Sequence, residues 1–444
     1  MAISLTHTLL AMLGGILVIL LLTVRFRIHA VFALLAACLV TGLAIGDSPL
    51  EIIALVKDGF GNILKSLSLI IILGTTLGLL LEQNGSTRTM ADFILKRTGS
   101  RKPAFAMSVT GYITGLPIFC DSAYIVLCGL NTQLARRTGV SVIYVAASLA
   151  TGLLSVHCLV PPHPGITAAA TTLGVDLGRV ILFGMMIAIP AMLVGHSWTL
   201  YAGKKIKATN ELLPAETENS DLPRVGLWAS ILPVIIPILL IAFRSIWQLE
   251  EDHRGPLINF LLAMGDPVIA LSIGIFLAFI PKQSRKKLQV SILFHDAVEK
   301  AGAILMIIGA GGAFGAILAS TKIGEQLSEV AGLSKLGILF PFLLAVLLKT
   351  AQGSSTVAVI TASTIIQPLL PVIGLQSGNG PLLAVLAMGA GSMIISHAND
   401  AYFWVISKFS GIEMPAMLRI YSMATLWMGL TSFFFVYLLS LFLK

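Results

Sequence analysis

The sequence predicts an all-α membrane protein that crosses the bilayer many times. Of its 444 residues, 56% are hydrophobic and 11% are charged, whereas about a quarter of the residues in soluble proteins are charged. Apolar runs of roughly 20 residues, the length of a membrane-spanning helix, recur from end to end. These runs are continuous rather than alternating, which excludes a transmembrane β-barrel. Several runs are interrupted by proline, glycine and polar residues, which predicts discontinuous helices and re-entrant hairpins.

Composition also excludes several functions. The net charge is +8, but most Lys and Arg lie in short loops, as cytoplasmic retention requires. No basic helix or aromatic-basic surface supports nucleic-acid binding. The four cysteines lie in apolar stretches without metal-ligand spacing, so we expect no metal site. The first apolar run lacks a basic segment and a cleavage site, which favours a retained span over a signal peptide.

The first half begins with three spans and a basic segment. The spans are expected at residues 5–23, 30–45 and 63–81, and the basic segment at residues 82–102. Arg25, Arg27 and the basic segment should face the cytoplasm, which places the N-terminus outside.

Two interrupted units follow. Residues 103–135 form two short apolar arms around Gly115–Ser122, with basic residues at both ends. We expect a re-entrant hairpin that enters from the cytoplasm, because neither arm is long enough to span. Residues 141–173 form a helix broken at Pro161, Pro162, Pro164 and Gly165, beside His157 and His163. A broken helix with ionisable groups indicates a transporter binding site; the alternative is a proline kink with satisfied histidines.

The second half repeats this order after a return span at residues 179–201. We expect a cytoplasmic linker at 203–224, spans at 225–243, 267–280, 302–319 and 415–442, a polar loop at 244–265, a hairpin at about 336–370 and a broken helix at 382–409.

Positional matches favour an internal duplication. Gly311 follows Gly74 by 237 residues, and His397 follows His157 by 240. The basic segment 82–102 and its less basic counterpart 320–335 should lie on opposite sides, so the repeats are inverted. We therefore divide the chain into a first repeat (1–202), a linker (203–224) and a second repeat (225–444), with both termini periplasmic. The alternative is chance similarity between apolar segments.

The four interruptions are expected to meet near the midplane of the membrane. Helix ends there offer N–H groups and partial positive charge, which suit a carboxylate. The acids Asp121 and Asp400 could take up the coupling proton or simply cap helices. Lys349 either balances a substrate charge or reaches toward the interface. Hydroxyl and amide groups that could bind a hydroxylated solute are Ser122, Gln352, Ser354, Ser355, Thr356 and Asn399.

An enzyme is disfavoured, and we assign no catalytic residue. His157 and His163 lie six residues apart, rather than the four that place two metal ligands on one helix face. No nucleophile has a base and an orienting group nearby. An intramembrane hydrolase is the alternative from another class.

Four motifs resemble the gluconate:proton symporter (GntP) family across essentially the whole chain. They are Gly115-Leu116-Pro117-Ile118-Phe119 with Asp121, Pro161-Pro162-His163-Pro164-Gly165, Ala351-Gln352-Gly353-Ser354, and Ser396-His397-Ala398-Asn399-Asp400. The resemblance implies proton-driven import of gluconate or related sugar acids across the inner membrane, D-serine being the substrate of one relative. It also implies inverted repeats, a dimeric scaffold and an elevator mechanism, with protons as coupling ions and no cofactor.

The resemblance also implies a substrate site, with the residues Pro117, Asp121, His163, Gln352, Gly353, Ser354, His397, Asn399 and Asp400. The interruptions themselves add Gly115, Ser122, Ser355 and Thr356 to the predicted site. Asp121 is the first candidate for the proton carrier, followed by His163 and Asp400. The run Cys120–Tyr124 departs from the pattern of gluconate carriers, so another sugar acid is an alternative substrate. A uniporter or channel is the alternative mechanism.

Overall fold

The computed structural model describes residues 5–98, 102–203, 225–247, 256–280, 290–321, 336–397 and 400–443. These parts are helices and connecting turns, without strands. Seven helices are long and apolar enough to cross a membrane, or eight if one bent pair forms a single span. Most of the predicted linker and most of the segment 320–335 lie outside the described residues. The fold class is therefore confirmed as a helical protein with several membrane spans.

The helices of the first half follow the predicted order. They are α1 (Leu5–Leu20) with the π-helical turn Leu21–Arg25, α2 (Ala30–Ala44), α3 (Pro49–Gln83), α4 (Ser86–Thr98), α5 (Pro103–Gly115), α6 (Cys120–Thr138), α7 (Val142–Leu159), α8 (Pro164–Thr172) and α9 (Leu177–Gly203).

The second half contains a similar series. It comprises α10 (Leu227–Trp247), α11 (Pro256–Met264), α12 (Pro267–Phe279), α14 (Val290–Ser320), α16 (Leu339–Gln352), α17 (Ser355–Ile366) with the 3₁₀ turn Gln367–Leu369, α18 (Gly380–Gly391), α19 (Ala401–Ser410), α20 (Met414–Met417) with the π-helical turn Leu418–Ser422, and α21 (Met423–Phe442).

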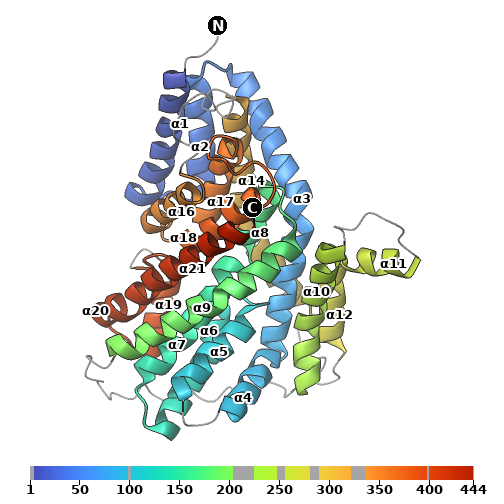
Figure 1. The fold of residues 1–444 in the computed structure, drawn as a ribbon, viewed down its shortest axis with the longest axis vertical. Coiled ribbons are helices and arrows are strands. Elements are labelled where there is room, and N and C mark those ends of the chain that lie inside the picture. Colours follow the sequence, from blue (N-terminus) through green and yellow to red (C-terminus); the bar gives the residue numbers. More distant parts are fainter. Residues whose placement is uncertain are drawn as a thin grey trace.

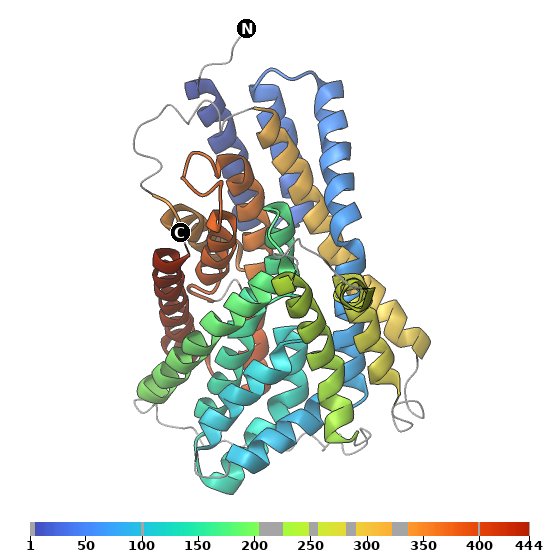
Figure 2. The same cartoon turned by 45° about the vertical axis from the view of Figure 1, so that its right-hand side comes forward.

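Helix α3 runs along much of the length of the molecule and packs against α14 (Figures 1 and 2). Its 35 residues correspond to about 52 Å at 1.5 Å per residue, far more than the predicted span at 63–81. The helix begins early because Ser48 and Glu51 form a capping box and Pro49 occupies its first turn. The Ser48 N–H group, which donates to the Glu51 carboxylate, lowers the pKa of that carboxylate. Local capping thus extends the helix beyond its apolar run.

The predicted polar loop at 244–265 is partly wrong. Its last part forms α11, which is bent by 74° from α12. Asp266 ends the bend: one carboxylate oxygen accepts from the Val268 N–H, and the other pairs with Arg244 at 2.9 Å. Helix α12 can begin directly after α11 because Asp266 caps its N-terminus and Pro267 occupies its first turn.

Helices α5 and α7 approach very closely where each carries a glycine. A Cβ atom on Gly152 would lie 2.2 Å from the Ser108 carbonyl oxygen, and one on Gly111 would lie 2.5 Å from the Leu149 carbonyl oxygen. Small residues of this kind allow membrane helices to pack backbone to backbone. This contact holds the first hairpin against the broken helix α7–α8.

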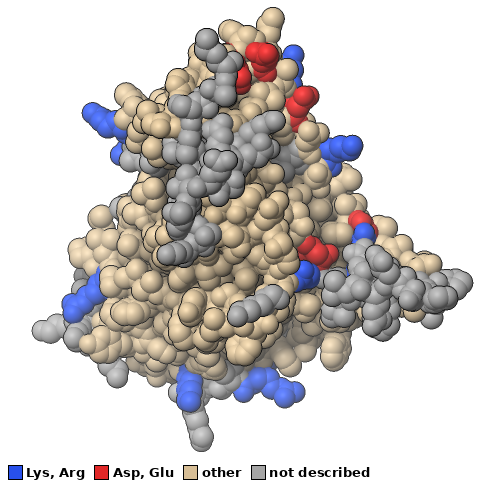
Figure 3. All heavy atoms as spheres, turned by 45° about the horizontal axis from the view of Figure 1, so that its top comes forward, with Lys and Arg blue, Asp and Glu red and all other residues tan. Residues whose placement is uncertain are grey.

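The face seen in Figure 3 is largely uncharged, and many of its charged side chains lie toward the edges of the view. Large apolar side chains such as Leu17, Leu239 and Phe276 are exposed by 60% or more. Such exposure is expected of helices that face lipid.

We expect Gly152→Ala to destabilise the protein by about 1–3 kcal/mol, because the new methyl group overlaps backbone that only a shift of α5 could relieve. Thermal unfolding of the detergent-purified protein measures the effect. The matched control is Gly61→Ala in α3, where a Cβ meets nothing within 4 Å. Equal melting temperatures for the two variants would contradict this account of the α5–α7 contact.

Candidate functional site

The first hairpin tip and the first helix break are joined by a hydrogen bond. His163, the residue before α8, donates from Nε2 to the carbonyl oxygen of Gly115, the last residue of α5, at 2.8 Å. The His163 ring also contacts the rings of His157 and Phe119, with centroids 4.8 and 6.3 Å away. The two interruptions of the first half therefore form one unit.

The first break also touches the second hairpin tip. A Cβ atom on Gly165 would lie 3.0 Å from the Cα atom of Thr356, in the first turn of α17. Helices α8 and α17 pack together along this contact. A side chain at residue 165 would force one of the two backbones to shift by a few tenths of an ångström. This contact joins the two halves of the chain.

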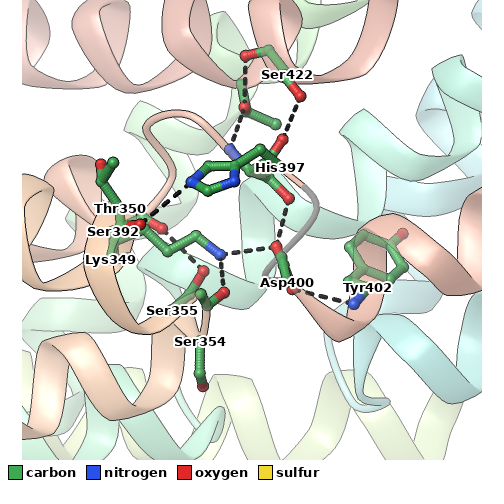
Figure 4. A network of polar contacts seen from close by, with 12 residues as sticks. Lys349, Thr350, Ser354, Ser355, Ser392, His397, Asp400, Tyr402 and Ser422 are labelled. Atoms are coloured by element: carbon green, nitrogen blue, oxygen red, sulfur yellow. Dashed lines mark hydrogen bonds and ion pairs between the residues drawn. The ribbon is translucent and has the colours of Figure 1, made fainter. Parts of the chain in front are cut away.

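The second tip and the second break are joined by a buried ion pair (Figure 4). Lys349 Nζ lies 2.7 Å from Asp400 Oδ2, and the two side chains are only 1% and 9% exposed. The same ammonium donates to the carbonyl oxygen of Gly353, and the Ser396 hydroxyl donates to the same Asp400 oxygen. His397 adds a bond from Nε2 to the Thr350 carbonyl oxygen at 3.2 Å.

The second break returns to the first hairpin and completes a ring of contacts. Asp400 caps α19 by accepting from the Tyr402 N–H at 3.0 Å. The Tyr402 ring meets the Tyr124 ring of α6 edge to face at 6.0 Å. The Tyr124 hydroxyl is bonded to Ser410 at the end of α19. The four interruptions are thus linked in the order first tip, first break, second tip, second break, and we call this arrangement the interruption ring.

The N-termini of four helices meet in the interruption ring, and they are capped differently in the two halves. In the second half, Ser354 caps α17 and Asp400 caps α19 through their side chains. In the first half, neither Phe119 at the start of α6 nor His163 at the start of α8 forms a side-chain cap. The first-turn N–H groups of α6 and α8 therefore remain available to an anion.

The polar side chains near the ring that have buried atoms without a hydrogen-bond partner in the described part of the chain include Gln352, with both amide atoms, and His157, with Nδ1. Gln352 is the last residue of α16, beside the left-handed Gly353 (φ 85°) that ends this helix. A buried polar group without a partner costs about 1–3 kcal/mol, so these atoms are suited to bind a polar ligand.

Asp121 differs from Asp400 in its partners. It lies in the first turn of α6, where Cys120 Sγ approaches one of its oxygens at 3.8 Å. It interacts electrostatically with Asp400 and Lys349. Among the described residues, however, only Asp400 forms an ion pair with Lys349.

Most predicted site residues are in the interruption ring, but their roles differ. Ser354 and Ser355 serve the structure, since Ser354 caps α17 and the Ser355 hydroxyl donates to the Ser392 carbonyl oxygen at 2.8 Å. Pro117 lines an apolar cavity with Pro161 and Pro162 rather than a polar one. Ser122 lies in α6, but its side chain is not among those described, and Asn399 lies outside the described residues.

The role of Lys349 was left open by the sequence, Ser396 was identified only as part of a motif, and Tyr402 was not predicted. Lys349 neither reaches the interface nor lies free for a substrate, because its ammonium is buried against Asp400. A lysine within the apolar run of α16 was a signal for such a partner. Nothing in the sequence pairs residue 349 with residue 400, since this contact joins segments 51 positions apart.

The chain is similar to known permeases and transporters along nearly its whole length. Residues 7–442 match the model of the GntP family permeases. A gluconate permease of Pseudomonas aeruginosa is 31% identical over 445 residues, covering 98% of both chains. The D-serine transporter DsdX of Escherichia coli O6:H1 is also 31% identical, covering 93% of this chain and 94% of DsdX.

The fold resembles that of MtrF from Neisseria gonorrhoeae, one of a class of antimetabolite efflux pumps. The TM-score is 0.63 at 16% sequence identity, covering 87% of this chain and 83% of MtrF. At this identity the likeness concerns the fold alone.

Removing one partner of the buried ion pair should reduce the stability of the fold more than replacing both partners. We expect Lys349→Met to cost about 3–5 kcal/mol, because it leaves the Asp400 charge buried without a partner. Adding Asp400→Asn should recover much of this loss, since asparagine can still cap α19. A double-mutant cycle on melting temperature measures the coupling.

The control for this cycle is Arg244→Ala, which breaks the exposed pair with Asp266. Its side chains are 29% and 38% exposed, and such pairs contribute about 0–1 kcal/mol. If losing Lys349 changed stability no more than losing Arg244, the proposed stabilising role of the buried pair would be wrong.

Proposed function

The chain belongs to the GntP permease family, and we propose that it imports gluconate or a related small hydroxylated sugar acid together with protons. Members of this family are permeases, so the chain is a transporter and not an enzyme. The observation that carries the proposal is the interruption ring, where two uncapped helix N-termini lie beside an acid outside any described ion pair. Discontinuous helices that meet in this way form the substrate sites of secondary transporters.

In this proposal the substrate carboxylate binds at the first turns of α6 and α8. These helices have 19 and 9 residues and no side-chain cap, so their N–H groups and dipoles favour an anion. The Gln352 amide, unpartnered and buried, supplies a donor and an acceptor to the hydroxyl groups. A sugar acid has both kinds of group.

The coupling proton is assigned to Asp121 in preference to His163 and Asp400. The Asp400 charge is already balanced by Lys349, and His163 donates to the Gly115 carbonyl oxygen. Asp121 forms no ion pair with a described residue, and a carboxylate at this depth is costly when ionised. Protons are the coupling ions, and no other cofactor is required.

The inverted repeat is supported by matching helix contacts in the two halves. Helix α1 packs on α2 as α10 packs on α12, and α2 packs on α14 as α12 packs on α3. Likewise α5 packs on α7 and α7 on α9, as α16 packs on α18 and α18 on α21. This arrangement supports repeats at 1–202 and 225–444, each with one re-entrant hairpin and one broken helix.

The proposal also includes an elevator movement of the ring-bearing helices, a homodimer and insertion in the inner membrane, all of which rest on the family. Periplasmic termini are proposed from the placement of basic residues. An equally placed alternative substrate is D-serine, because the relative DsdX is as similar as the gluconate permease. Its ammonium group could bind Asp121 while its carboxylate occupies the same helix ends.

The first test is uptake of labelled gluconate into proteoliposomes under an imposed inward proton gradient, with unlabelled sugar acids and D-serine as competitors. We expect the gradient to drive accumulation and one competitor to abolish it. Uptake that ignores the gradient would indicate a uniporter. Asp121→Asn should lose accumulation but retain exchange, because a neutral side chain cannot release the proton. The control Asp58→Asn changes an exposed acid on α3 and should accumulate normally.

A second prediction concerns Gln352. Gln352→Ala should raise the KM for the transported sugar acid about 10-fold, the value of one or two hydrogen bonds to a polar ligand. Its control is Gln367→Ala, at an exposed glutamine in the turn after α17. An unchanged KM for Gln352→Ala in the same vesicles would exclude Gln352 from the substrate site.

A further inference from the structure

The Lys349 ammonium donates to two buried oxygen atoms. The Gly353 carbonyl oxygen and Asp400 Oδ2 both accept from Nζ, and the Ser396 hydroxyl is bonded to the same carboxylate oxygen (Figure 4). The carbonyl belongs to the residue that ends α16, where the helix dipole is negative. A main-chain carbonyl and a carboxylate are oxygen ligands of the kind that bind hard cations, and the Ser396 hydroxyl positions the carboxylate oxygen.

The Lys349 side chain places its ammonium group at the C-terminal end of its own helix. Lys349 lies one helical turn before Gly353, so its side chain folds along its own helix and returns to the C-terminal carbonyl. The side chain is 1% exposed, so it cannot exchange its partners for water. Unwound carbonyls and helix C-terminal ends are also the groups that hold dissolved coupling cations in other transporters.

We propose that Lys349 is a built-in cation that fills a monovalent-cation site between the second hairpin tip and the second helix break. Its ammonium supplies the positive charge that this site would otherwise take from solution, so transport needs no dissolved cation other than the proton. The role of Lys349 in transport rests on the proposed function. The presence of a cation site in the folded chain does not depend on that function. Removing the side chain should open the site to a small cation.

The test uses Lys349→Ala in detergent, with about 100 mM methylammonium, sodium or tetramethylammonium chloride. Methylammonium and sodium are small enough to replace the lost group, whereas tetramethylammonium matches the ionic strength and has no N–H donor. We expect methylammonium or sodium to raise the melting temperature by about 2–4 °C over tetramethylammonium. Wild type, Lys408→Ala at an exposed lysine of α19, and the double variant Lys349→Ala/Asp400→Ala should show no such difference.

If Lys349→Ala is too unstable for a melting experiment, the yield of monodisperse protein is measured instead. Solubilisation in methylammonium or sodium should then recover several-fold more protein than solubilisation in tetramethylammonium. Equal melting temperatures and equal yields in the three salts would overturn the proposal. So would an equal cation effect in the double variant, because that variant lacks the carboxylate of the site.

Uptake provides the second measurement. For the substrate that the wild type transports, Lys349→Ala should lose uptake and regain it about five-fold or more with methylammonium or sodium, but not with tetramethylammonium. Normal uptake by Lys349→Ala without added cation would overturn the proposal. If the wild type transports no tested sugar acid or D-serine, the proposed function fails, while the melting experiment still decides whether the cation site exists.

Discussion

The backbone groups freed at four helix interruptions must be satisfied without bulk water, and the rest of the structure depends on this requirement. An unpaired backbone group in the apolar part of a membrane costs several kcal/mol. Here side chains supply the donors: His163, from the first helix break, donates to the carbonyl end of α5, and Lys349, within α16, donates to the carbonyl end of its own helix. The interruption ring is therefore held together by the same groups that broken helices leave unpaired.

The two halves meet this requirement in different ways. Carbonyl ends receive a side-chain donor in both halves, the His163 imidazole in the first and the Lys349 ammonium in the second. The N–H ends are capped by Ser354 and Asp400 only in the second half. The second half is therefore structurally complete, whereas the first half retains open donors. In the proposed inverted repeat, the second half therefore supports the site, and the first half provides the N–H groups for the substrate carboxylate.

Prolines and glycines made much of this arrangement predictable from the sequence. Pro161, Pro162 and Pro164 cannot continue a helix, so the break between α7 and α8 was evident. Caps and long-range pairs were less accessible, because they depend on where the helices lie. The start of α3 at Pro49 came from a local capping box, and the partner of Lys349 came from tertiary packing alone. Apolar length therefore located the spans, but not the ends of the helices or the contacts between interruptions.

The charges of the interruption ring suggest how a proton and an anion become coupled. Lys349 balances Asp400, so an ionised Asp121 leaves one net negative charge among these three side chains. At an effective dielectric constant of about 20, a substrate carboxylate about 6 Å from that charge is repelled by about 3 kcal/mol. Such a repulsion lowers affinity about 100-fold. In the proposed mechanism, protonation of Asp121 removes this repulsion, so the anion binds well only to the protonated site, and release of either ion favours release of the other.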